Sequence, residues 1–131
     1  MVTSISAHAA LVRTLKKHQI VMFGSFTLRS GMQSEYYCDI KRALGIPTVL
    51  EQIIRKLVML VPPDATCIAG SGYGGITLAS LVAYKKRLPI VLVRDVVKDH
   101  GTKQRIDGYV PHLRDWACII DDVYTTGSSI E

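Results

Sequence analysis

The segment CIIDDVYTTGSSI, residues 118–130, constrains the fold and chemistry of this chain more than any other. A short apolar run of this kind is typical of a strand buried in a parallel sheet, and it ends abruptly in two carboxylates, Asp121 and Asp122. The loop that follows carries hydroxyl side chains on both sides of Gly127 and is expected to open a helix. Because hydroxyls and backbone N–H groups at a helix N-terminus bind phosphate well, the segment predicts an anion site at the end of a strand.

The loop and the acids together predict a ligand that has both a phosphate and free hydroxyls. The loop has no lysine, whereas a loop that holds the β- and γ-phosphates of a nucleotide carries GK[ST], so a single phosphate monoester fits better. Carboxylates repel phosphate but accept strong hydrogen bonds from hydroxyls such as those of a ribose. The pattern therefore favours a ribose 5-phosphate site. The alternative is an acid pair that only caps the following helix.

Apolar periodicity along the chain predicts strands that alternate with helices. Helical spacing occurs at residues 5–17, 47–60 and 75–86. Short strands are predicted at residues 20–23, 26–28, 67–69, 90–93 and 117–120, with a further extended piece through Tyr36 and Tyr37. Strands that alternate with helices indicate the α/β class, with a parallel sheet flanked by helices and ligands at the carboxyl ends of the strands.

Three loops are expected to meet at that edge of the sheet, namely residues 70–75, 94–108 and 121–129. The first of them, GSGYGG, has four glycines in six positions, which lets backbone N–H groups wrap an anion without side chains in the way. On its own, this loop is equally well explained by a tight turn. The three loops together predict one binding site.

Length and charge limit the class of protein. At 131 residues the chain is predicted to form a single domain, and its longest apolar runs are too short to span a bilayer. The excess positive charge of +5 comes from residues 85–105, which contain seven basic residues and two acidic ones. Such a segment attracts either nucleic acid or phosphorylated small molecules, or is simply a solvated face. Three cysteines without metal-ligand spacing, and no secretory leader, predict a reduced, cytoplasmic setting.

Four motifs give the chain a resemblance to a known family. CIIDDVYTTGSSI resembles the phosphoribosyl pyrophosphate signature of the type I phosphoribosyltransferases. FGSFTLRSGMQSEYY resembles the amino-terminal hood strand of the orotate phosphoribosyltransferases, VRDVVKDHG resembles their mobile catalytic loop RKxxKDHG, and GSGYGG is similar to their pyrophosphate loop GPxYKG. The resemblance implies a type I phosphoribosyltransferase fold, with a helix and a small hood in residues 1–45 and an α/β core in residues 46–131.

The resemblance also implies a reaction and its residues. Orotate and phosphoribosyl pyrophosphate would give orotidine 5′-phosphate and pyrophosphate, with Lys98 and His100 catalytic because they neutralise the departing pyrophosphate. Orotate would contact Tyr37, Cys38 and Thr125. Phosphoribosyl pyrophosphate would contact Arg29, Tyr73, Gly74, Arg94, Lys98, His100, Asp121, Asp122, Val123, Tyr124, Thr125, Thr126, Gly127, Ser128 and Ser129.

The same resemblance implies a cofactor and a partner. Mg²⁺ fits because a diphosphate leaving group needs its charge offset, and the metal would be held through the substrate rather than by protein ligands. A homodimer is expected, in which the mobile loop, residues 94–108, reaches the neighbouring subunit's site. Neither nucleic acid nor membrane is an expected partner.

The sequence departs from the family pattern in three ways. Gly74 stands where the pyrophosphate loop has lysine, and Asp95 stands where the catalytic loop has its second basic residue. The sequence given stops at Glu131, one turn into the helix behind the phosphate loop, and family members continue with further elements. A carboxyl-terminally truncated enzyme with little activity of its own, its loop poorly ordered from Val123 onward and its third core strand exposed at an edge, is therefore expected.

Two alternatives to the orotate enzyme remain open on the sequence. One is a phosphoribosyltransferase for another purine or pyrimidine base. The other is a non-enzymatic regulator that senses phosphoribosyl pyrophosphate and binds nucleic acid through its basic segment. Retention of Lys98 and His100 argues against the regulator, because a sensor does not need the catalytic loop.

Overall fold

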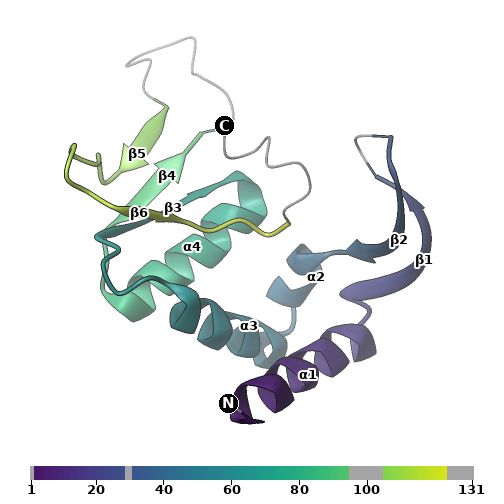
Figure 1. Cartoon of the computed structure of the whole chain (residues 1–131). Coiled ribbons are helices and arrows are strands. Elements are labelled where there is room, and N and C mark those ends of the chain that lie inside the picture. The colour runs from purple at the N-terminus through teal and green to yellow at the C-terminus, as the bar shows by residue number, and fades with distance from the viewer. Residues whose placement is uncertain (1, 29–30, 95–104, 124–131) are drawn as a thin grey trace. The chain divides into compact units, whose positions relative to one another are not determined.

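The computed structural model of the chain describes residues 2–28, 31–94 and 105–123, without the side chains of residues 2–7 (Figure 1). The described contacts divide the chain into two compact units, residues 1–53 and 54–131, and the division falls within one helix. The predicted single domain over residues 1–131 stays a prediction.

The first unit consists of helices and one antiparallel hairpin. Helix α1 spans Val2–Lys17 and extends the helix predicted over residues 5–17. Strands β1, Val21–Thr27, and β2, Gln33–Cys38, pair antiparallel, and the short helix α2, Ile40–Leu44, follows. Ile20 is fully buried before β1, and its carbonyl accepts a hydrogen bond from the Asp39 N–H at 2.8 Å, which closes the open end of the hairpin.

Two predictions for the first unit need correction. The strands predicted at residues 20–23 and 26–28 are one strand, β1, whose pairing with β2 shifts register between Phe23 and Phe26. A β-bulge at the intervening Gly24 keeps the strand continuous where the sequence suggests a break. Helix α2 was not predicted, because five residues are too few to show helical periodicity.

The second unit is built on a four-stranded sheet (Figure 1). Its strands are β3, Cys67–Ser71, β4, Ile90–Val93, β5, Ile106–Gly108, and β6, Ala117–Ile119, in the order β5-β4-β3-β6. Strand β3 is parallel to β4 and to β6, as the apolar runs predict. Strand β5 is antiparallel to β4 and was missed, since it lies within the predicted loop of residues 94–108.

Two helices accompany this sheet. Helix α3, Pro47–Leu60, begins with the proline that a first helical turn tolerates, as predicted. Helix α4, Gly72–Lys86, packs on β3 and β4 (Figure 1). Its buried residues Leu78, Ala79, Val82 and Ala83 recur at helical spacing and meet a core that contains Cys67, Ile68 and Val91. The α/β class and the largely parallel sheet flanked by helices are confirmed.

Helix α4 begins earlier than the sequence predicts. The start was placed at Gly75, because glycines indicate a loop, but the helix begins at Gly72. Strand β3 ends at Ser71, and Gly72 makes the turn with φ +60°, a backbone conformation that costs glycine little. The predicted loop of residues 70–75 is therefore a direct passage from strand to helix.

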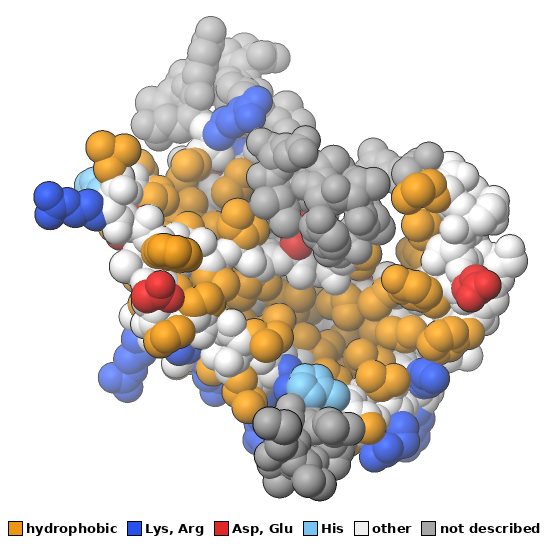
Figure 2. Space-filling view, viewed as in Figure 1, with side chains coloured by type: hydrophobic (Ala, Val, Ile, Leu, Met, Phe, Trp, Pro, Cys, Tyr) orange, Lys and Arg blue, Asp and Glu red, His pale blue; other side chains and the backbone are white. Residues whose placement is uncertain are grey.

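Strand β6 lies at an edge of the described sheet, as predicted for the third core strand. Trp116 and Ile119 are more than half exposed, and Met59 and Leu60 at the end of α3 are exposed as well. A hollow of about 250 Å³ lies between the end of α3 and β6, lined by Leu57, Leu60, Val61, Cys118, Ile119, Ile120 and Asp121. Hydrophobic side chains are visible at the surface in the part of the view that contains β6 (Figure 2). Among the described residues, no helix is long and apolar enough to cross a membrane.

A hydrogen-bonded network fixes the amino-terminal end of β6. The Asp115 carboxylate accepts from the Thr66 hydroxyl at 2.8 Å, from the Tyr109 hydroxyl at 2.7 Å and from the His112 N–H at 2.7 Å. The Thr66 hydroxyl in turn accepts from the Trp116 N–H at 2.9 Å. The network joins the residue before β3 to the segment between β5 and β6, and so sets where β6 begins.

This network makes the stability of the fold depend on pH. The backbone N–H of His112, followed by the Tyr109 and Thr66 hydroxyls, lowers the pKa of Asp115 below its ordinary value of 3.8. The folded state thus favours the carboxylate, and the stabilisation is present above pH 3.8 and lost as the pH falls through the lowered pKa.

We expect Asp115→Asn to reduce the urea midpoint at neutral pH and to flatten its decline below pH 3.8. Asp64→Asn, outside the network, is the control. If the urea midpoint of Asp115→Asn declined below pH 3.8 as steeply as that of the parent, the expectation would be contradicted.

Candidate functional site

The acid pair lies against the first turn of α4. A Cβ added at Gly74 would overlap the Asp122 carboxylate and lie 2.7 Å from the Asp122 Cβ. A Cβ added at Gly75 would lie 3.1 Å from the Ile120 carbonyl oxygen and 3.2 Å from Asp121 Oδ1. The two glycines therefore let the end of β6 approach the start of α4: a side chain at position 74 would collide with Asp122, and one at position 75 would be tightly packed against Ile120 and Asp121.

The electrostatics of this contact favour the two carboxylates. The first turn of a helix carries a partial positive charge because its N–H groups have no partner within the helix. Asp121 Oδ1 also accepts a hydrogen bond from the Asp122 N–H at 2.8 Å, which fixes the turn after β6. The acids thus lie beside the helix that precedes them in the chain. The alternative, in which they cap the helix expected after them, concerns positions outside the described residues and stays a prediction.

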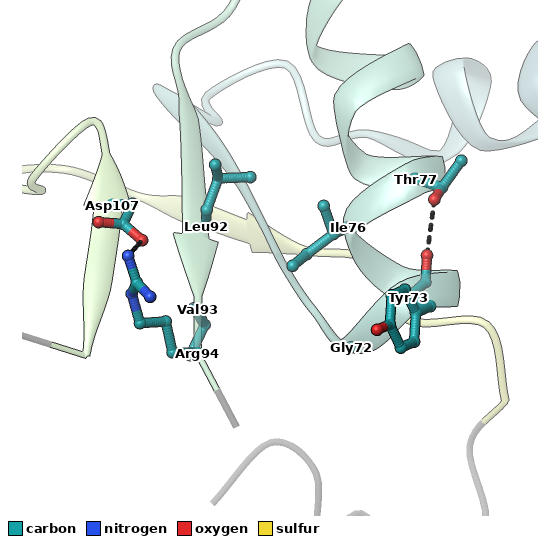
Figure 3. Close-up of a pocket in the computed structure, with 8 residues that line it drawn as sticks. All are labelled: Gly72, Tyr73, Ile76, Thr77, Leu92, Val93, Arg94 and Asp107. Atoms are coloured by element: carbon teal, nitrogen blue, oxygen red, sulfur yellow. Dashed lines mark hydrogen bonds and ion pairs between the residues drawn. The ribbon is translucent and has the colours of Figure 1, made fainter. Parts of the chain in front are cut away.

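A pocket of about 500 Å³ opens beside the same turn of α4 (Figure 3). Gly72, Tyr73, Ile76 and Thr77 line it from α4, and Leu92, Val93, Arg94 and Asp107 line it from β4 and β5. Tyr73 is 90% exposed. Arg94 follows β4 and forms an ion pair with Asp107 on β5, as the dashed line in Figure 3 shows.

The second unit thus brings together described parts of all three predicted loops. Tyr73 and Gly74 from the first, Arg94 from the second and the acid pair from the third lie at the carboxyl ends of β3, β4 and β6. Val123 follows the acid pair and is exposed. Tyr37 and Cys38, expected at orotate, end β2 in the first unit.

The other predicted site residues lie outside the described residues. These are Arg29, Lys98, His100, Tyr124, Thr125, Thr126, Gly127, Ser128 and Ser129. The expected disorder from Val123 onward concerns the same part of the chain and stays a prediction.

Sequence reasoning missed Asp107. The residue belongs to RIDG, in which Ile106 and Gly108 also form β5. The available signal for a short antiparallel strand was the polar residue between an apolar residue and a glycine, directly after a basic segment. Three residues are too few for alternation to stand out.

The described residues offer no metal centre of their own. Within residues 2–28, 31–94 and 105–123, no group of three or more His, Cys, Asp or Glu side chains could hold a metal ion. The oxygen ligands at the rim are the carboxylates of Asp121 and Asp122, which suit a hard cation such as Mg²⁺ only together with oxygens from a ligand.

Comparison with known proteins places the chain in a family. No protein-family model matches it. The orotate phosphoribosyltransferase of Methanosarcina mazei is 39% identical over 121 residues, which are 92% of this chain and 64% of that protein. The orotate phosphoribosyltransferase of Methanococcus maripaludis is 36% identical over 135 aligned positions, which cover 99% of this chain and 72% of that protein. The chain belongs to the orotate phosphoribosyltransferase family.

Solved structures agree with membership of the orotate phosphoribosyltransferase family. The Aeropyrum pernix orotate phosphoribosyltransferase matches 77% of this chain and 59% of its own, with a TM-score of 0.65 and 31% identity. The Leishmania donovani UMP synthase matches 92% of this chain and 26% of its own, with a TM-score of 0.72 and 29% identity. The resemblance carried by the motifs is thus confirmed. The chain spans about two thirds of the length of the curated orotate phosphoribosyltransferases it matches, 64% and 72% in the two named above.

Substitution of Gly74 tests the contact between α4 and the acid pair. Alanine within a helix is normally more stable than glycine by about 0.5–1 kcal/mol. At Gly74 the added methyl group would collide with Asp122, and such overpacking costs about 1–3 kcal/mol. We therefore expect Gly74→Ala to lower the free energy of unfolding by roughly 1 kcal/mol, measured by urea denaturation.

The matched control is Gly45→Ala. Gly45 has an ordinary φ of −82°, and an added Cβ would meet only the Arg42 carbonyl oxygen at 3.6 Å. That variant should be nearly as stable as the parent. If Gly74→Ala were equally harmless, the acid pair would not lie against α4 in solution.

Proposed function

We propose that this chain carries the phosphoribosyl pyrophosphate site of an orotate phosphoribosyltransferase. The reaction joins orotate N1 to ribose C1 of phosphoribosyl pyrophosphate and gives orotidine 5′-phosphate and pyrophosphate, a step of UMP biosynthesis. The observation that carries the proposal is the first turn of α4, which has the acid pair against Gly74 and Gly75 and lines a pocket with an arginine through Gly72 and Tyr73. Family membership supports the choice of orotate over other bases.

The described residues divide between the two parts of the donor substrate. Asp121 and Asp122 accept hydrogen bonds from the ribose hydroxyls, since carboxylates bind hydroxyls strongly and repel phosphate. Arg94 and the backbone around Tyr73 and Gly74 receive the pyrophosphate, a role supported by the helix N-terminus and the guanidinium that line the pocket.

The remaining roles rest on the motifs of the sequence. The hydroxyl-rich loop Thr125–Ser129, with Val123 and Tyr124 before it, binds the 5′-phosphate, and Arg29 reaches the pyrophosphate. Tyr37, Cys38 and Thr125 contact orotate. Lys98 and His100 offset the charge that develops on the leaving pyrophosphate.

The chemistry explains why the proposed site has cations and no nucleophile. Ribose C1 loses its leaving group through an oxocarbenium-like state, so the largest benefit comes from positive charge on the departing pyrophosphate and from exclusion of water. The helix N-terminus and Arg94 supply fixed positive charge on one side. The loop that contains Lys98 and His100 supplies charge that can close over the substrate.

Mg²⁺ belongs to the proposal as a partner of the substrate. Bound to the diphosphate, it offsets charge on the leaving group. No protein ligand is assigned to the ion: the substrate would provide its oxygens, and the acid pair is left to the ribose hydroxyls. A homodimer that shares residues 94–108 between subunits, and a cytoplasmic location, belong to the same proposal and rest on the family resemblance and the cysteine pattern.

Titration and product analysis test the proposed function. Isothermal titration with phosphoribosyl pyrophosphate and Mg²⁺, followed by orotate, should give saturable heats, and orotidine 5′-phosphate should form with orotate but not with hypoxanthine, adenine or uracil. In the active protein, Lys98→Ala should lower turnover by about 10²- to 10³-fold. Lys85→Ala, at the far end of α4, is the matched control. Steeply salt-dependent binding to DNA without any base transfer would support the regulator instead.

Neutralising the acid pair tests its proposed role in ribose binding. Asp121→Asn combined with Asp122→Asn keeps the shapes of the side chains but removes two charged acceptors. Each charged hydrogen bond contributes about 1.5–3 kcal/mol, so phosphoribosyl pyrophosphate should bind at least about tenfold more weakly by titration. Asp64→Asn removes a carboxylate elsewhere on the second unit and should leave binding unchanged. Equal or tighter binding by the double variant would restrict the pair to a structural role at α4.

A further inference from the structure

The ion pair between Arg94 and Asp107 joins the two strands that form one wall of the pocket. Arg94 comes directly after β4, and its backbone N–H donates to the Arg105 carbonyl at 2.9 Å, so its main chain is held in the ladder with β5. Asp107 lies opposite Leu92 in the same ladder. Residues two apart on a strand share a face, which makes Arg94 and Asp107 diagonal neighbours across the pair of strands.

The place of Asp107 in the proposed anion pocket needs a physical reason. Of the described residues that line the pocket, Arg94 and Asp107 are the charged ones, and their charges cancel. The start of α4, with its partial positive charge, lies on the opposite wall (Figure 3). A carboxylate there repels a diphosphate, so its presence weakens binding unless it provides something in return.

Fold stability is a poor explanation for the pair. The two side chains are 33% and 44% exposed, and ion pairs at that exposure contribute little to stability. A better explanation is that the pair holds the Arg94 side chain in position. An arginine side chain loses much rotamer freedom when it is held in one place, and that loss weakens ligand binding unless another group has already ordered it. Because a guanidinium has five N–H donors, one carboxylate leaves several donors for a second anion.

We propose that Asp107 is a positioning residue that holds the Arg94 guanidinium at the pocket, ready to bind the pyrophosphate group of the substrate. The inference rests on the proposed function for the identity of the ligand. It assigns Asp107 no contact with the substrate: the carboxylate acts through Arg94. The gain from an ordered arginine exceeds the repulsion between the carboxylate and the diphosphate.

The direction in which Asp107→Asn changes pyrophosphate affinity decides between positioning of Arg94 and simple repulsion of the ligand. If Asp107 orders Arg94, Asp107→Asn should weaken binding of inorganic pyrophosphate in the presence of Mg²⁺ by about 3- to 10-fold, the usual cost of ordering a flexible side chain. If Asp107 only competes with the ligand for Arg94, the same variant should bind more tightly. Isothermal titration of the 131-residue chain measures the change, and Asp64→Asn, which removes the same charge outside the pocket, is the control.

A second background shows whether Asp107 acts through Arg94. In Arg94→Ala, the further change Asp107→Asn should leave pyrophosphate binding unchanged or strengthen it, because no guanidinium remains to be held. In the ligand-free protein, the heteronuclear NOE of the Arg94 Nε–H group reports how ordered the arginine side chain is. This NOE should fall in Asp107→Asn and stay high in Asp64→Asn. A merely structural role would change the thermal midpoint and leave both of these readouts alone.

The outcomes separate this inference from the proposed function. The positioning role is overturned, while the function stands, if Asp107→Asn binds pyrophosphate as tightly as the parent or more tightly. It is also overturned if Asp107→Asn weakens pyrophosphate binding equally in the parent and in Arg94→Ala. Pyrophosphate binding that weakens as expected, in a chain that gives no saturable heat with phosphoribosyl pyrophosphate and Mg²⁺, supports the positioning role and counts against the function. A parent chain that does not bind pyrophosphate with Mg²⁺ overturns both.

Discussion

The second unit depends on one close approach, that of the end of β6 to the first turn of α4. Asp122 fills the space beside Gly74, and the Ile120 carbonyl and Asp121 carboxylate fill the space beside Gly75. The contact requires glycine at the start of a helix, where most sequences place larger residues, and the helix dipole offsets part of the charge that it brings in. Because of it, the ends of β3 and β6 lie at one rim, and the acid pair lies against α4, the helix that also lines the pocket formed with β4 and β5.

The same contact gives a physical reason for one departure from the family pattern. Gly74 stands where the resembling motif has lysine, which removes a cation from the pyrophosphate loop. With Asp122 in its observed place, no side chain fits at position 74. Among the described residues that line the pocket, the positive charge available to a diphosphate comes from the N-terminus of α4 and from Arg94, which raises the importance of how Arg94 is held.

Much of the second unit could be predicted because its signals are local. The apolar runs of β3, β4 and β6 are typical of buried parallel strands and predict them directly. What was missed depends on pairing between distant residues. Strand β5 has three residues and exists because β4 pairs with it, β1 stays one strand because β2 bridges its bulge, and α4 starts early because β6 packs on its glycines. For the candidate site, the motifs predict the acid pair, Tyr73, Gly74 and Arg94, which the structure places at the carboxyl ends of the strands, whereas Asp107 is found only through the ladder that brings it beside Arg94.

The acid pair is held from both ends of a very short strand. Strand β6 has three residues, or about 10 Å at the usual rise per residue, and pairs with β3 on one side. At its start, the network of Asp115 with Thr66, Tyr109 and His112 fixes the chain, and at its end the Ile120 N–H donates to the Ala69 carbonyl at 2.8 Å. A shift at the start therefore has little length over which to relax before it reaches Asp121 and Asp122. Residues at the amino-terminal edge of the sheet, at the other end of β6, thereby help to set the position of the carboxylates at the rim.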